Sequence, residues 1–186
     1  MEISDQIIEN KDFTVSPLEE AYVNCRFKQC RFAGLTQRDT TWENCVFDTC
    51  DFSLAKLKHT AFYDAFFKDC KLMGTDFSSC NPFSSFRFGQ CQMRYANFRG
   101  MKMIKTSFVM CDMVGTDFAN ANLQGSLFEQ CDLSGAMFHN TNLMAADFSS
   151  AYNMAIVPEN NKLKNAVFSR LNLEGLVIHL GIKFKD

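Results

Sequence analysis

A five-residue step runs through most of this chain and restricts its fold more than any other feature. Large residues recur every fifth position from Phe27 to Phe77 and again from Phe83 to Phe148, which gives 25 positions. All but Gln37 are Phe, Leu, Met or Trp, and the residue two places earlier is Ala, Cys, Ser or Thr in 21 of the 25 cases. One added residue near Asn81-Pro82 separates the two phases. The chain is therefore a repeat protein over most of its length.

A period of five fits neither the 3.6 residues of a helical turn nor the two-residue alternation of a strand. If each unit forms one side of a square coil, four units make a turn of about 20 residues, with the large residue and the small one before it both pointing inward. Coils stacked at a strand spacing of roughly 4.8 Å would give a rod on the order of 30 Å long. Since proline cannot donate to a ladder, we expect a bulge or bend at Pro82.

The repeat resembles the A-(D/N)-L-x-x pattern of the pentapeptide-repeat family. The units that carry the resemblance are Thr75-Asp76-Phe77, Thr116-Asp117-Phe118, Ala121-Asn122-Leu123 and Ala146-Asp147-Phe148. The resemblance implies an all-β solenoid, a right-handed quadrilateral β-helix, which we place at residues 21–152. Residues 1–20 are then expected to cap the first coil, with Ile3, Ile7 and Ile8 as apolar contacts in either a helix or a strand.

After Ala151 the fivefold pattern ends and a helical pattern follows. Leu173, Leu176, Val177 and Leu180 stand at i, i+3, i+4 and i+7 and predict a short helix. Asn172 is expected to cap its start and Gly181 its end. Residues 182–184 then read as a short strand.

The segment from Val157-Pro158-Glu159-Asn160 to Leu180-Gly181-Ile182 looks like the C-terminal module of the Qnr-type quinolone-resistance proteins within this family. Those relatives dimerise head to head through the module and are thought to mimic a DNA duplex that binds DNA gyrase. The resemblance implies that residues 153–186 form a homodimer interface; alternatively, the apolar stripe caps the last coil of a monomer. The expected interface residues are Leu171, Leu173, Leu176, Val177, Leu180, Ile182 and Phe184.

The nine cysteines fall into register with the 20-residue coil. Six form one inward column: Cys30, Cys50, Cys70, Cys91, Cys111 and Cys131. Such a cluster can be a metal site, a redox relay or a set of small apolar fillers. A stacked column points its ligands one way, whereas zinc needs four that converge, so we predict fillers and no metal. The phenylalanines are likewise expected to fill the lumen.

A net charge of −2 conceals a segregation along the sequence. Residues 83–105 contain five basic side chains and no acid, whereas residues 106–161 contain six acids and no Lys or Arg. A head-to-head dimer would bring the acidic halves together, which suits a mimic of duplex DNA. Alternatively, aspartates before the large residue simply bond the turn backbone. The expected partner-binding residues are Asp112, Asp117, Glu129, Asp132 and Asp147.

Nothing in the sequence indicates catalysis, a cofactor or a small-molecule substrate. His59, His139 and His179 have no spacing typical of a metal or nucleophile site, and no phosphate-binding or nucleophile motif occurs. The N-terminus lacks the features of a signal peptide, and no apolar run is long enough for a membrane span. We therefore expect a cytoplasmic protein with reduced cysteines.

The sequence favours a dimeric, non-enzymatic protein that mimics DNA and interacts with DNA gyrase or topoisomerase IV, without binding DNA directly. The competing hypothesis is a scaffolding solenoid with an unrelated protein target, because one fold supports many functions. Qnr-type members from Gram-negative bacteria carry long projecting loops that matter for protecting gyrase. No comparable insertion occurs here, so both protection and simple inhibition of the enzyme remain open.

Overall fold

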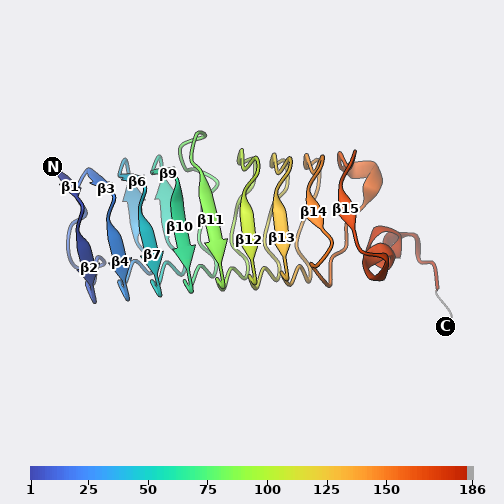
Figure 1. Ribbon diagram of the computed structural model, residues 1–186, viewed down its shortest axis with the longest axis horizontal. Helices are drawn as coiled ribbons and strands as arrows, with labels where there is room; N and C mark the ends of the chain where they lie inside the picture. The colour runs from blue at the N-terminus through green and yellow to red at the C-terminus, as the bar shows by residue number, and fades with distance from the viewer. Residues whose placement is uncertain (184–186) are drawn as a thin grey trace.

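The five-residue units become short extended segments joined at sharp corners, and the corners stack into a rod (Figure 1). The computed structural model describes residues 1–183, and for residues 37 and 38 the backbone alone. At most corners the residue two places after the large one takes a left-handed backbone, as at Gln29 (φ 52°) and Asn44 (φ 51°). Glycine adopts this conformation without steric cost, and Gly34 (φ 68°) and Gly115 (φ 67°) occupy such corners.

Every strand pair is parallel, which confirms the predicted solenoid. One side of the rod carries a nine-stranded sheet, called here the nine-stranded face: β2 (Ile7–Glu9), β4 (Arg26–Lys28), β7 (Val46–Asp48), β10 (Ala65–Lys68), β11 (Phe86–Gly89), β12 (Ser107–Val109), β13 (Leu127–Glu129), β14 (Asp147–Phe148) and β15 (Val167–Phe168). A second side carries β1 (Glu2–Ser4), β3 (Ala21–Val23), β6 (Thr41–Glu43) and β9 (Ala61–Tyr63). A third has isolated bridges, and the fourth has β5 (Thr36–Arg38), β8 (Lys56–Lys58) and further bridges.

The solenoid includes the N-terminal segment that we expected to be a separate cap. Strand β2 pairs with β4, so that Ile8 lies beside Phe27, an offset one residue shorter than the 20 between Phe47 and Phe67. Ile3 and Ile8 pack against the core, whereas Ile7 is exposed. Residues 1–20 thus form the first coil. Nine strands at about 4.8 Å make the rod about 40 Å long, longer than the repeat alone indicates.

The added residue lies between β10 and β11, where Ala65 pairs with Phe86. Residues 81–85 leave the regular path, and Figure 1 shows them as the green loop that rises above the neighbouring turns. Pro82 stands in a turn outside any strand, as expected of a residue without an N–H. Phe83, which the repeat predicts to point inward, is instead 76% exposed.

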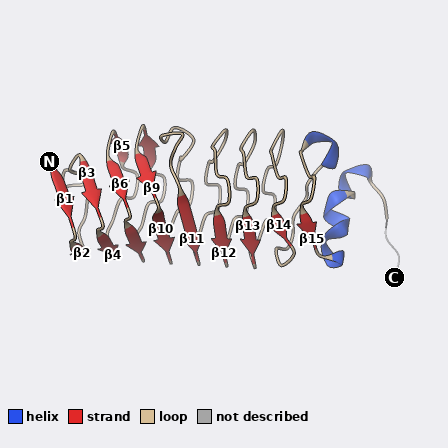
Figure 2. Ribbon diagram, turned by 45° about the horizontal axis from the view of Figure 1, so that its top comes forward, coloured by secondary structure: helices blue, strands red, loops and turns tan. Residues whose placement is uncertain are grey.

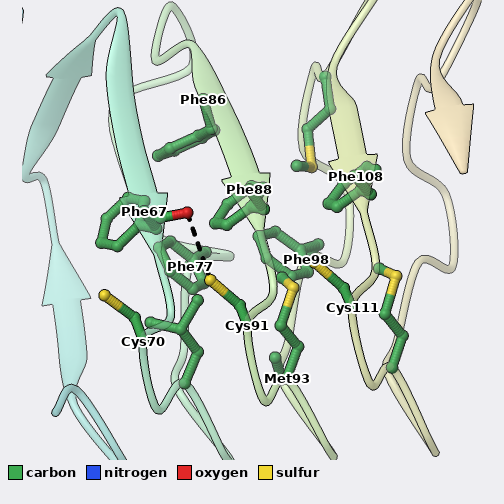
Figure 3. Close-up of a cluster of buried hydrophobic side chains, with 14 of the residues drawn as sticks. Phe67, Cys70, Phe77, Phe86, Phe88, Cys91, Met93, Phe98, Phe108 and Cys111 are labelled. Carbon is green, nitrogen blue, oxygen red and sulfur yellow. Dashed lines mark hydrogen bonds between the residues drawn. The ribbon is translucent and has the colours of Figure 1, made fainter. Parts of the chain in front are cut away.

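The lumen place vacated by Phe83 is filled from the next side of the coil. Phe86 occupies a position that is small in most other coils, and it is buried. Its ring lies 5.4 Å from that of Phe62 and 5.6 Å from that of Phe77, centroid to centroid (Figure 3). Since a lumen must be filled to native density, the exchange of one phenylalanine for another preserves the core across the slip.

Columns of stacked rings fill the rest of the lumen. Phe88 and Phe108 stand 5.2 Å apart with an interplanar angle of 2°, and the column continues through Phe128 to Phe148. The cysteines occupy the small positions as predicted, and all nine are buried and free. Each thiol of the column contacts backbone carbonyls, as Cys91 Sγ does with Phe67 O at 3.3 Å (Figure 3). These thiols act as small fillers that also satisfy polar backbone atoms.

Burial of the Cys45 thiol makes folding stability depend on pH in the alkaline range. Desolvation raises the pKa of Cys45 from 9.0 to about 12. Below pH 9 the thiol is protonated in both the folded and unfolded chains; above it, only the unfolded chain ionises. The contribution of Cys45 to folding stability should therefore fall by about 1.4 kcal/mol per pH unit between about pH 9 and pH 12.

Cys45→Ala should fold, because alanine occupies the same column at Ala65. The variant should also lose stability less steeply with pH, because one fewer thiol ionises on unfolding. Urea unfolding midpoints measured from pH 8 to pH 10.5 give the slope. An alkaline slope equal to that of the wild type would show that Cys45 ionises equally well in the folded chain.

Candidate interaction surfaces

The C-terminal module closes the rod with short 3-10 helices rather than one α-helix (Figure 2). They are η1 (Pro158–Asn160), η2 (Arg170–Leu176) and η3 (Ile178–Leu180). Gly181 ends η3 in the left-handed conformation predicted for it (φ 67°). Asn172 lies inside η2 and caps nothing; its side-chain amide donates to the carbonyls of Ala151 at 2.6 Å and Phe148 at 3.4 Å. Ile182 is not part of a strand, and Phe184 lies outside the described residues.

The module is fixed to the last coil by close backbone contact. The Ile156 amide donates to the Gly175 carbonyl at 2.9 Å, and a Cβ at Gly175 would overlap the Met154 carbonyl oxygen. Leu176 packs against the hydrophobic core, so it caps its own chain. This contact agrees with the alternative of a capping stripe for Leu176.

The other predicted interface residues divide by exposure. Val177 is half-buried, whereas Leu171 is 93% exposed. The exposed apolar set, called here the apolar end, comprises Leu171, Leu173, Ile178, Leu180 and Ile182. Ile178 was not among the predicted residues, although it follows Val177 directly. Five large apolar side chains on one end of a rod are more than a single coil covers.

The predicted acidic residues lie on three sides of the rod. Glu129 and Asp147 are on the nine-stranded face. The backbones of Asp112 and Asp132 form a parallel β-bridge on the third side, and Asp117 is on the fourth. The five side chains thus do not form one continuous patch.

Two of these acids are paired with the basic segment that precedes them in sequence. Arg94 Nε lies 2.6 Å from Asp112 Oδ2, and Arg99 Nη1 lies 3.5 Å from Asp117 Oδ2. Arg94 directly follows the large residue Met93, and Asp112 directly precedes Met113, the large residue one coil later. Stacking of the coils therefore brings together two residues that are 18 apart in sequence. The segregation of charge along the sequence is therefore largely cancelled in space at these positions, and the 18-residue spacing could have revealed it.

The aspartates also support the turns, as the alternative interpretation holds. The amides of Ala119, Ser134 and Ser149 donate to Asp117, Asp132 and Asp147 at 2.8, 3.0 and 2.8 Å. These are hydrogen bonds of an Asx turn. A structural role and a role in binding are compatible, because each turn amide uses only the Oδ1 atom of its carboxylate.

Within residues 1–183, three of the five predicted acids have no cation at ion-pair distance: Glu129, Asp132 and Asp147. Burial opposes ionisation of Asp132, but hydrogen bonds from Ser134 and Asn153, together with the more distant positive charge of Arg94, outweigh this effect and lower its pKa. Glu129 and Asp132 lie on the coil of β13 and Asp147 on that of β14, so that the coil of β15 stands between them and the apolar end. These three side chains are the acidic part of the candidate surface.

The described residues contain no cluster of side chains suited to metal binding. Within residues 1–183, no group of three or more His, Cys, Asp and Glu side chains could hold a metal ion. His179 Nε2 lies 3.4 Å from Glu159 Oε2, an isolated pair at the C-terminal end. None of the helices described has the length and apolar character needed to cross a bilayer.

Stacked parallel coils around a filled lumen define a β-solenoid, a class of protein whose functions reside on its outer faces and ends. The model of the protein family described as pentapeptide repeat region matches residues 40–108 and 82–178. Together the two matches span most of the sequence, and the chain belongs to the pentapeptide-repeat family.

Solved structures give the same fold. A trypsin-treated variant of QnrB1, a plasmid-mediated fluoroquinolone resistance protein, aligns over 100% of this chain and 92% of its own, with a TM-score of 0.61 and 18% identity. Full-length QnrB1 covers 98% of this chain and 100% of its own at a TM-score of 0.45 and 18% identity. HetL is involved in heterocyst differentiation regulation in the cyanobacterium Nostoc sp. strain PCC 7120. It covers 89% of this chain and 86% of its own, with a TM-score of 0.31 and 16% identity. The first alignment establishes likeness of fold, and the two lower scores add nothing to it. Comparison with curated protein sequences finds no match.

Proposed function

We propose that this chain is a non-enzymatic, cytoplasmic binding protein that dimerises through the apolar end and engages a type II topoisomerase, DNA gyrase or topoisomerase IV, as a mimic of duplex DNA. The observation that carries the proposal is the position of the three acids with no cation at ion-pair distance, Glu129, Asp132 and Asp147, on the coils of β13 and β14 in the half of the rod that leads to the exposed apolar end. A head-to-head dimer would place six such carboxylates around its centre.

The physical reason is electrostatic. A protein groove that binds DNA is lined with Lys and Arg, which gain from anionic groups along a rod. A filled β-solenoid has no flexible loops between its acids, so the carboxylates keep fixed positions at multiples of the roughly 4.8 Å coil spacing. The likeness of fold to QnrB1 is consistent with this function, and the shortness of the loop at residues 81–85 leaves both protection and inhibition of the enzyme open.

A scaffolding function is the second candidate, and one observation favours it. Arg94 and Arg99 neutralise Asp112 and Asp117, two of the five acids on which mimicry was predicted to depend. In that case the outer faces would bind a protein target unrelated to DNA enzymes, and the turn-supporting aspartates would have no other role.

The test removes the three negative charges without removing their turn hydrogen bonds. The variant Glu129→Gln, Asp132→Asn, Asp147→Asn should fold normally, because asparagine occupies the same repeat position at Asn122. Mimicry predicts that about tenfold more of it is needed to inhibit gyrase supercoiling or to relieve quinolone inhibition, about 1.4 kcal/mol of binding.

A matched control has the same change in charge on coils far from the apolar end. In Glu43→Gln, Asp51→Asn, Asp76→Asn, the two aspartates also accept turn amides, from Ser53 at 2.9 Å and Ser78 at 3.0 Å. This control should act like the wild type. If both variants lost activity on gyrase equally, net charge rather than the position of the acids would explain the effect. A wild-type protein inactive on gyrase at micromolar concentration would refute the proposal.

A further inference from the structure

The nine-stranded face has a notch at its middle, across β10, β11 and β12, with a volume of about 470 Å³. It exists because Gly89 has no side chain, whereas the equivalent residues of the adjacent coils are Lys68 and Val109. Ser107 is small as well, so the depression extends toward β12. The main lining residues are Phe66, Lys68, Arg87, Gly89, Ser107 and Val109.

One wall of the notch is aromatic and cationic. A Cβ at Gly89 would lie 3.5 Å from the Phe66 ring, so the ring borders the space left by the glycine. The Arg87 guanidinium carbon lies 5.3 Å from the centroid of the Phe66 ring. Lys68 adds a second positive charge, and the opposite wall is Val109 with the exposed Met110. An apolar space is thus bordered by two cations and by no carboxylate among its lining residues.

The two cations can still accept a new anion. Arg87 Nη2 lies 3.3 Å from Asp64 Oδ1, and Lys68 Nζ lies 3.8 Å from Asp69 Oδ2. These side chains are between 41% and 65% exposed, and such surface pairs contribute little to stability. A guanidinium has five N–H donors, so the Asp64 contact leaves others for a second carboxylate.

The surrounding charges do not suit nucleic acid. Of the basic residues at 87–105, Arg94 and Arg99 are paired with Asp112 and Asp117 on other sides of the rod. A phosphate backbone needs a track of cations, whereas here Arg87 and Lys68 stand next to a small apolar space. The pattern fits an apolar group with a carboxylate beside it.

We propose that this notch is a docking site for a protein segment that carries an aromatic side chain next to an acidic one. The aromatic ring would enter the space above Gly89, between Phe66 and Val109, and the carboxylate would meet Arg87 and Lys68. Aromatic anchors in small pockets supply much of the affinity of protein interfaces, and an open notch on a flat sheet suits a side chain presented by a partner. The site is separate from the acids and the apolar end of the proposed function.

The probe is a capped synthetic peptide with one phenylalanine between two aspartates, titrated into the ¹⁵N-labelled full chain. We expect amide shifts confined to residues 66–68, 87–90 and 107–110. A peptide with lysines in place of the aspartates should bind at least about tenfold more weakly, because it keeps the ring and reverses the charge.

Gly89→Val supplies the matched loss of site. Gly89 does not have a positive φ, and a Cβ there makes only ordinary contact with Phe66, so the variant should fold and unfold like the wild type while no longer binding the acidic peptide. Equal binding of both peptides, binding retained by Gly89→Val, or no shifts at millimolar peptide would overturn the proposal. So would the same shifts on raising the protein concentration alone, since a second copy would then be the occupant.

Discussion

Phe86→Ala is expected to lower the free energy of unfolding by about 3–5 kcal/mol, whereas Phe83→Ser should change it by less than about 0.5 kcal/mol. Phe86 is buried among the rings of Phe62, Phe67 and Phe77, so its removal leaves a cavity that the stacked coils cannot close. Phe83 is 76% exposed, and its amide bonds the Asn81 side chain at 2.9 Å independently of its ring.

Urea unfolding of the two variants measures both changes in one experiment. The pair is a sensitive test of the slip, because the five-residue repeat taken alone places both Phe83 and Phe86 in the lumen and predicts a large loss for each variant. A larger loss for Phe83→Ser than for Phe86→Ala would show that the coil keeps its regular register through residues 81–85.

The second large effect concerns the apolar end. Leu171→Asp with Leu180→Asp should convert the proposed dimer into a monomer of 21.2 kDa, because an interface cannot bury two carboxylates without partners. Both leucines are exposed within one chain, and Leu176, which packs against the core, is left unchanged. Folding should therefore survive the substitution.

Light scattering coupled to gel filtration gives the molar mass. Val15→Asp with Leu54→Asp is the matched control, since Val15 and Leu54 are exposed apolar residues in the N-terminal part of the rod. The control should keep the dimer mass. A wild-type protein that is monomeric at micromolar concentration, or a Leu171 and Leu180 double variant that still dimerises, would remove the central geometry on which DNA mimicry depends.

The sequence predicts the regular part of the rod because every coil repeats the same physical requirement. A lumen that admits one large and one small residue on each side fixes the inward column from Phe27 to Phe148, and the 20-residue spacing places the thiols. The first coil escapes prediction because the step from Leu18 to Tyr22 is four residues rather than five, which gives the 19-residue offset. Its inward residues Ile3, Ile8, Phe13 and Leu18 keep the five-residue spacing, but they lie out of phase with the rest of the chain.

The surfaces were less predictable than the core. Spacing of i, i+3, i+4 and i+7 does not distinguish an α-helix from consecutive 3-10 turns, and the contact of Gly175 with the Met154 backbone depends on tertiary structure. Counting charges by segment also missed the pairing of Arg94 with Asp112, because neighbours in a solenoid are separated by about one coil in sequence. The notch at Gly89 depends on one absent side chain, which no motif would have indicated.

The interrupted side at residues 81–85 has a mechanical consequence. Beyond this loop, three sides of the rod continue their ladders, through Arg87 with Ser107, Gln92 with Asp112 and Asn97 with Asp117. On the remaining side no backbone hydrogen bond joins residues 81–85 to residues 101–105 within the described chain. A rod that lacks the backbone ladder on one of its four sides resists bending least toward that side. The rod should flex at this point and in this direction, so that its two halves can adapt their relative angle to a curved partner while each half stays rigid.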